Sequence, residues 1–127
     1  WPATEFRAAG ERLATAVGDV DGGTVVATQG LLVLEAGLPL DPAFATGEFV
    51  WRLGGVDHGP ARVVTTANVA RHLAAHPPAA VLVDAHARWD APLVAWVRAR
   101  GGRLHPVAGG VAVWTPLPAR GSGLSWD

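Results

Sequence analysis

The sequence predicts an α/β fold, a small three-layer α/β/α sandwich whose sheet is mainly parallel and ends in a C-terminal antiparallel hairpin. Segments with apolar residues at helical spacing alternate with short runs of β-branched and aliphatic residues. Such alternation is typical of right-handed crossovers, which place helices on both faces of a parallel sheet. The last two runs, at residues 103–107 and 111–115, flank Gly109-Gly110, and this pattern predicts the hairpin.

Size and composition favour one folded domain over a disordered chain. The 127 residues are 50% hydrophobic and only 17% charged, which provides enough apolar surface for a core. We place a single α/β domain at residues 1–116 and a flexible tail at residues 117–127, where no hydrophobic periodicity is visible. Because the chain contains no Met, we expect it to be a piece of a longer protein.

The first half of the chain predicts a helix, a strand, a short helix and a long connection. Apolar residues at helical spacing indicate a first helix that starts after Thr4 as N-cap and ends at Gly18. A β-branched run at residues 24–28 predicts a buried strand. Residues 30–37 fit a strand or a short helix, and we favour the helix. Frequent Pro and Gly predict an irregular connection over residues 38–60.

The second half predicts a helix, a central strand and another helix before the hairpin. Thr66 is expected to cap a helix that ends before Pro77. Residues 79–84 are apolar on both faces, which predicts a buried strand at the centre of the sheet. Asp90 is the expected N-cap of the next helix, and Gly101-Gly102 is its expected end.

Composition excludes several classes of function. The formal net charge is −1, and no clustered basic face is visible, so we expect no nucleic-acid partner. The absence of Cys excludes a thiolate nucleophile and Cys-based metal sites. The absence of Lys excludes a P-loop, and no Gly pair lies in a dinucleotide-binding pattern, so we expect no cofactor. No apolar run reaches the ~20 residues that cross a bilayer.

Polar residues that follow the predicted strands form the best candidate site. Asp84, His86 and Arg88 come directly after the central strand, where open α/β sheets bind ligands. Thr28 and Gln29 follow the first strand, and they face the same crevice if the two strands are parallel neighbours. Asp84 and His86 suit a carboxylate–imidazole pair, but no nucleophile elbow accompanies them. We therefore interpret these residues as loop-ordering and substrate-facing, and we assign no catalytic residue.

Two other features have both structural and functional interpretations. His72 and His76 lie four residues apart on a predicted helix, a spacing at which two imidazoles can share a metal. The Glu of a metalloprotease helix is missing between them, so we interpret them as a solvated pair and expect no metal. Trp51 and Trp89 lie in or beside loops. Packing is the default role for both, and stacking on a sugar ring or insertion into a membrane interface is the alternative.

Five segments follow one another in a characteristic order, and they are Gly23–Thr28, Leu34–Pro39, His76–Asp84, Val94–Trp96 and Val111–Thr115. Their order resembles that in the C-terminal soluble domain of the GT-C type membrane glycosyltransferases. This family includes protein mannosyltransferases and bacterial enzymes that use polyprenyl-phosphate sugars. The resemblance covers roughly residues 6–115 and rests on the order and composition of the segments, without a diagnostic motif.

This resemblance implies an extracytoplasmic domain that packs over the transmembrane part of the same polypeptide. There it would help to bind a polyprenyl-phosphate sugar donor or a glycan acceptor. In the family the catalytic acidic residue lies in an early loop between transmembrane helices, so the chain is expected to be non-catalytic alone. The alternative is a free-standing α/β module that binds a ligand or a protein. A self-sufficient hydrolase is disfavoured, because the sequence offers no nucleophile with its supporting residues.

Overall fold

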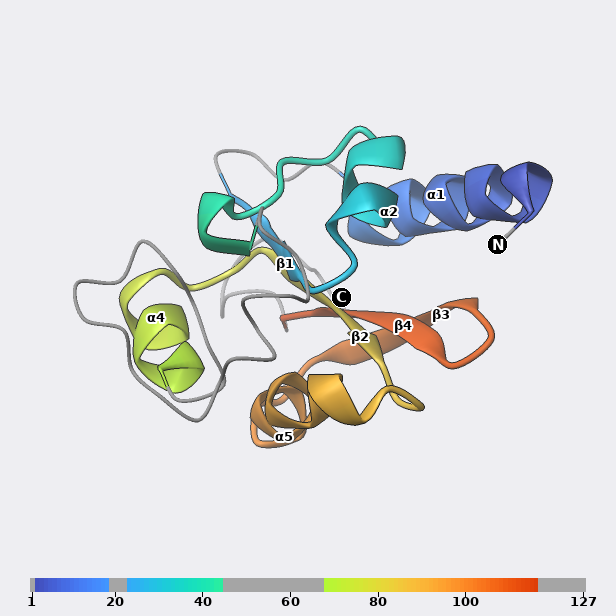
Figure 1. The fold of residues 1–127 in the computed structure, drawn as a ribbon. Coiled ribbons are helices and arrows are strands. Elements are labelled where there is room, and N and C mark those ends of the chain that lie inside the picture. The colour runs from blue at the N-terminus through green and yellow to red at the C-terminus, as the bar shows by residue number, and fades with distance from the viewer. Residues whose placement is uncertain (1, 19–22, 45–67, 117–127) are drawn as a thin grey trace, which may run out of the picture.

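A four-stranded sheet organises the part of the chain that the computed structural model describes, which is residues 2–18, 23–44 and 68–116. Figure 1 shows the sheet with helices packed around it. Two of the helical segments, η1 and η2, are single 3-10 turns. The elements are α1 (Ala3–Val17), β1 (Val25–Ala27), α2 (Gly30–Glu35), η1 (Pro42–Phe44), α4 (Val69–Ala75), β2 (Ala80–Asp84), η2 (Arg88–Asp90), α5 (Ala91–Arg98), β3 (Arg103–Ala108) and β4 (Val111–Thr115).

The sheet has the strand order β1-β2-β4-β3 and is mixed. β1 and β2 are parallel, whereas β4 is antiparallel to both of its neighbours, β2 and β3. The expectation of a mainly parallel sheet is therefore wrong. The crossover through α5 does bring β3 back in the direction of β2, but β4 lies between the two strands.

Burial explains why β4 takes the inner position. Three of its five residues are buried, whereas β3 has one buried residue and carries the exposed side chains of Arg103, Leu104 and Pro106. Proline and charged residues suit an edge strand, because they discourage pairing with a further strand. The expected antiparallel hairpin is confirmed, and Gly109 in its turn has φ +53°, a conformation that favours glycine.

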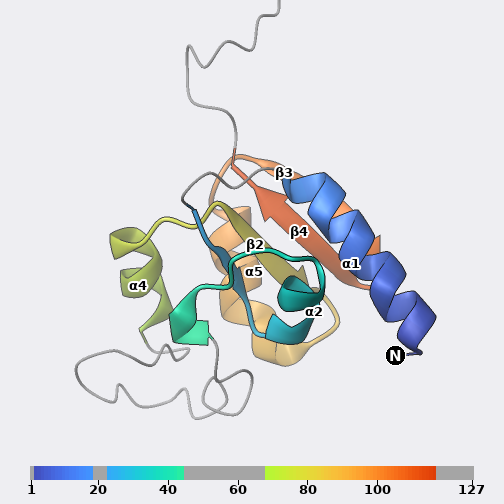
Figure 2. The same cartoon turned by 90° about the horizontal axis from the view of Figure 1, so that it is seen from above.

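β2 is the central strand, as the sequence predicts, and its residues divide the core into two clusters. Its first four residues are buried, and β1 and β4 pair with its two edges. Leu82 belongs to the cluster that receives α1 and α2, whereas Val81 and Val83 belong to the cluster that receives α4 and α5. This alternation follows from the two-residue period of a strand. Figures 1 and 2 show how these helices are arranged around the strands.

Several sequence predictions for single elements have a clear outcome. The helix that we favoured at residues 30–37 is confirmed as α2. Thr4 is not the N-cap of α1, because the helix already begins at Ala3, after Pro2 with its restricted φ of −59°. Thr66 and the expected tail at residues 117–127 lie outside the described residues. No helix within the described ranges is long and apolar enough to cross a membrane.

We predict that Leu82→Ala lowers the free energy of unfolding by about 2–5 kcal/mol, because it removes buried methyl groups and leaves a cavity. Leu82 is 2% exposed in the first cluster. The matched control is Leu31→Ala at a residue that is 75% exposed, and we expect a change within about 0.5 kcal/mol. Urea unfolding followed by Trp fluorescence measures both, and equal effects would contradict the assignment of Leu82 to the core.

Candidate functional site

The carboxyl ends of β1 and β2 lie at the same edge of the sheet, as expected for parallel neighbours. The register pairs Ala27 with Leu82, so Gln29 and Asp84 come close just beyond the paired residues. The Gln29 amide nitrogen donates to Oδ2 of Asp84 at 3.4 Å. The structure therefore brings together the residues that the sequence places after the two strands.

A buried carboxylate, that of Asp90, joins the two strand ends to α5. Its Oδ1 accepts a hydrogen bond from the Thr28 hydroxyl at 2.7 Å, and its Oδ2 accepts one from the Asp84 N–H at 2.8 Å. Asp90 is 2% exposed and Thr28 is 4% exposed. Hydrogen bonds to an ionised acceptor in a buried setting are short and strong. The carboxylate thus fixes the geometry of this edge.

This arrangement corrects the role expected for Asp90. The residue does occupy the N-cap position of α5, but its side chain makes no capping hydrogen bond to the helix. The carboxylate instead turns toward the strands, where a buried hydroxyl and a main-chain N–H supply donors. Pro92 in the first turn also lacks an N–H, so that turn has one donor fewer to cap.

Asp84 orders the loop that follows β2. Its Oδ1 accepts the main-chain N–H of His86 at 2.9 Å, which is the geometry of an Asx turn, and its carbonyl accepts the N–H of Ala87. The carboxylate bonds the main chain of His86 rather than its ring, so the carboxylate–imidazole pair is not formed. The exposed His86 ring occupies the space that a Cβ at Gly110 would need. These contacts support the loop-ordering interpretation.

Of the two tryptophans that the sequence prediction considers, the structure describes Trp89. Trp89 packs partly buried against the α4–α5 cluster, and the Arg88 guanidinium lies 4.6 Å from the centre of its ring. This contact is a cation–π interaction. Trp89 therefore has the packing role expected by default, and the Arg88 guanidinium covers its ring. Trp51 lies outside the described residues.

A second polar group lies between η1 and α4, and the sequence prediction named its histidines but missed Asp41. His72 on α4 contacts Asp41, with 2.8 Å between the imidazole Nε2 and Oδ2. The side chains are only 12% and 7% exposed. An ionised carboxylate can only accept, so Nε2 of His72 is the donor. The interpretation of His72 as a solvated residue is therefore wrong, because it packs onto a buried acceptor.

Asp41 is held in place from three sides. Its main-chain N–H donates to the Val25 carbonyl at 2.8 Å, beside an isolated parallel bridge between Val25 and Leu40. Its Oδ1 accepts the N–H of Ala43 at 2.9 Å, and its Oδ2 meets His72. Asp41 is thus anchored to the edge of β1, to the start of η1 and to α4.

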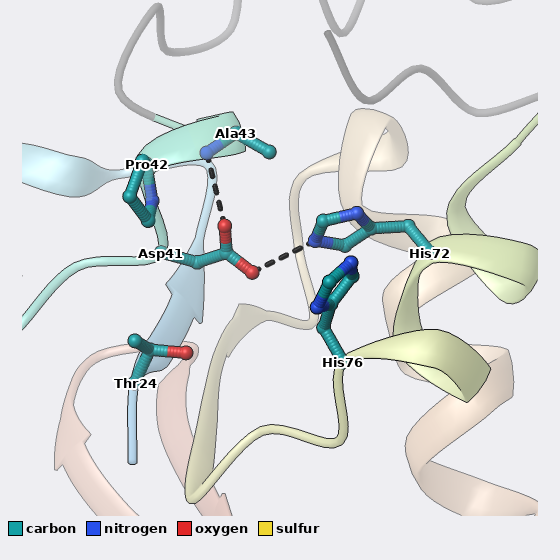
Figure 3. Close-up of a pocket in the computed structure, with 6 residues that line it drawn as sticks. All are labelled: Thr24, Asp41, Pro42, Ala43, His72 and His76. Atoms are coloured by element: carbon teal, nitrogen blue, oxygen red, sulfur yellow. Dashed lines mark hydrogen bonds and ion pairs between the residues drawn. The ribbon is translucent and has the colours of Figure 1, made fainter. Parts of the chain in front are cut away.

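A pocket of about 540 Å³ lies in front of this pair (Figure 3). The His76 ring completes one wall, with its centre 4.9 Å from that of His72 and its plane tilted by 38°. Within the described ranges, no group of three or more His, Cys, Asp or Glu side chains is placed to hold a metal ion. The described residues that line the pocket are Thr24, Asp41, Pro42, Ala43, His72 and His76.

Comparisons with protein-family models, with curated proteins and with solved structures found no match. The two polar groups of this fold are therefore interpreted from their own geometry.

We predict that Thr28→Val and Asp90→Ala each lower the free energy of unfolding by about 1–3 kcal/mol, because each breaks a buried hydrogen bond to a carboxylate. In the double variant the loss of unfolding free energy should be smaller than the sum of the two single losses by about 0.5–3 kcal/mol, because the two side chains interact directly. Chemical unfolding of the four proteins measures this coupling. The control is Thr4→Val, at an exposed residue of α1. Additive costs for Thr28 and Asp90 would refute the contact.

Proposed function

We propose that this chain is the extracytoplasmic soluble domain of a membrane-bound glycosyltransferase. In this proposal the domain assists the binding of substrate or acceptor, while catalysis resides in loops of the transmembrane part. The resemblance stated above supports it, and the segments that carry the resemblance include parts of β1, α2, β2, α5 and β4. We also propose that the layers form an α/β/α sandwich, since α1 and α2 contribute to one core cluster, whereas α4 and α5 contribute to the other.

The single observation on which this proposal depends is the bonding of Asp90. Its carboxylate accepts hydrogen bonds from the Thr28 hydroxyl and from the Asp84 main-chain N–H. These bonds fix the edge of the sheet that presents Gln29 and His86. Side chains on rigid strand ends bind with less loss of conformational entropy than side chains on free loops. The Asp84 carboxylate accepts a hydrogen bond from the main-chain N–H of His86 rather than from a catalytic imidazole. A preorganised binding surface is the role that this geometry supports.

The proposed partners follow from the same assignment. They are the transmembrane part of the same polypeptide and a polyprenyl-phosphate sugar donor or a glycan acceptor. The domain would lie on the extracytoplasmic face of the membrane.

The second candidate function is a free-standing module that binds a small ligand. The pocket in front of Asp41 favours it, because its volume of about 540 Å³ falls within the range usual for small-molecule sites. The open reading frame that encodes this chain separates the two functions. A membrane glycosyltransferase requires on the order of ten hydrophobic spans of bilayer length in the same frame. Their absence would exclude the first proposal and leave the second.

We predict that Gln29→Ala or His86→Ala, in the membrane-embedded parent enzyme, raises KM for the sugar acceptor or donor roughly 2- to 10-fold with little change in kcat. The reason is that a side chain that only assists binding stabilises ground state and transition state alike. Steady-state transfer of a radiolabelled sugar in membranes measures both constants. Arg7→Ala, at an exposed residue of α1, is the control and should match the wild type. A fall in kcat with KM unchanged would contradict an assisting role.

A further inference from the structure

The pocket in front of Asp41 is separate from the edge that holds Thr28 and Asp84. Thr24 lies just before β1, and Asp41 bonds the main chain of Val25, so the pocket adjoins the amino end of β1. Thr28 and Asp84 lie at the carboxyl ends of β1 and β2. The chemistry of the pocket therefore needs its own explanation.

Asp41 gives the pocket a fixed acceptor. A carboxylate has about four acceptor positions on its two oxygens. Ala43 and His72 use one position on each oxygen, at 2.9 and 2.8 Å. The remaining acceptor positions belong to a side chain that is anchored and almost fully buried. A ligand hydroxyl that donates to Asp41 meets an acceptor that does not have to reorganise.

His76 and Thr24 add donors on either side of that acceptor. The His76 ring is exposed, and a neutral imidazole has one N–H donor and one acceptor nitrogen. Figure 3 shows the Thr24 hydroxyl directed toward the histidine side of the pocket. Pro42 and Ala43 add apolar surface to the lining. The pocket thus combines hydrogen-bond donors, a carboxylate acceptor and apolar surface.

This pattern discriminates between classes of ligand. A phosphate or carboxylate would be repelled by Asp41, and none of the described lining residues is Lys or Arg. An apolar ligand would offer no hydrogen bond to the Thr24 hydroxyl, to the His76 ring or to the remaining acceptor positions of Asp41. Among the described residues, the side chains around the pocket do not form a group of three or more ligands that could hold a metal cation. An uncharged ring with several hydroxyls both donates to Asp41 and accepts from Thr24 and His76.

We propose that this pocket is a carbohydrate subsite, in which Asp41 accepts ligand hydroxyls and His76 and Thr24 bind neighbouring ones. His72 is a positioning residue that holds the Asp41 carboxylate. The inference rests on the proposed function for the origin of the sugar, a donor or a glycan acceptor. The chemistry of the pocket stands on its own contacts.

Nuclear magnetic resonance of the ¹⁵N-labelled 127-residue chain tests this subsite. The probes are methyl α-mannopyranoside, methyl β-glucopyranoside, methyl β-galactopyranoside and methyl β-arabinofuranoside, each titrated separately. We expect at least one of them to shift the Ala43 amide and the His72 and His76 ring signals in a saturable way. His76→Ala and Thr24→Val should each weaken that binding roughly 2- to 10-fold, because each removes a hydrogen bond.

The matched control is Thr4→Val, which makes the same replacement as Thr24→Val at an exposed residue of α1 and should leave the affinity unchanged. The amide spectrum of each variant shows whether it remains folded, and Asp41→Asn provides a second variant that keeps the shape of the side chain. No saturable shift with any glycoside would overturn the subsite. Shifts of the same signals by inorganic phosphate or methylammonium, with none by glycosides, would overturn it as well.

The outcome is independent of the test of the proposed function. An open reading frame without membrane spans excludes the glycosyltransferase but leaves glycoside binding to be measured on the chain. Absence of glycoside binding overturns the subsite, whatever the reading frame contains.

Discussion

The buried carboxylate of Asp90 is the interaction on which the carboxyl edge of this fold depends. Burying a charge is unfavourable unless donors replace the lost water. Thr28 at the end of β1 and the main chain of Asp84 at the end of β2 are two such donors. Because Asp90 also directly precedes α5, the same group links the parallel strand pair to the helix that covers it. The positions of Gln29 and His86 follow from this link.

The hairpin turn completes that edge. β4 pairs with β2 up to Asp84, so the turn at Gly110 reaches the loop after β2. There the N–H of Ala85 donates to the Gly110 carbonyl at 3.0 Å, and the His86 ring fills the space that a side chain at Gly110 would need. Had β3 taken the place beside β2, the loop after β2 would face a different neighbour. The mixed order of the sheet therefore shapes the candidate site.

Local patterns in the sequence predict most of the elements, and long-range pairing explains what they miss. The buried run of β2 follows from its length and apolar character, whereas the pattern at residues 30–37 fitted a strand as well as the helix that forms at Gly30–Glu35. The common edge of Gln29 and Asp84 depended on the two strands being parallel neighbours. The position of β4 beside β2 has no local signal, because a strand's partner depends on the burial of all strands together. Asp41 was missed because it stands in a Pro-rich connection, and its partner His72 is 31 residues away. Nothing local distinguishes that aspartate from a turn residue.

The two polar groups share β1, and this geometry decides how far they influence each other. Thr24 and Thr28 are four residues apart along extended chain, which corresponds to about 13 Å. Substitutions farther apart than roughly 7–10 Å, with no shared partner, usually act additively. Asp41 bonds Val25 and Asp90 bonds Thr28, so the groups touch the same strand at its opposite ends. Side-chain changes in the pocket should therefore leave the carboxyl edge intact, and binding at one group can be measured without loss of the other.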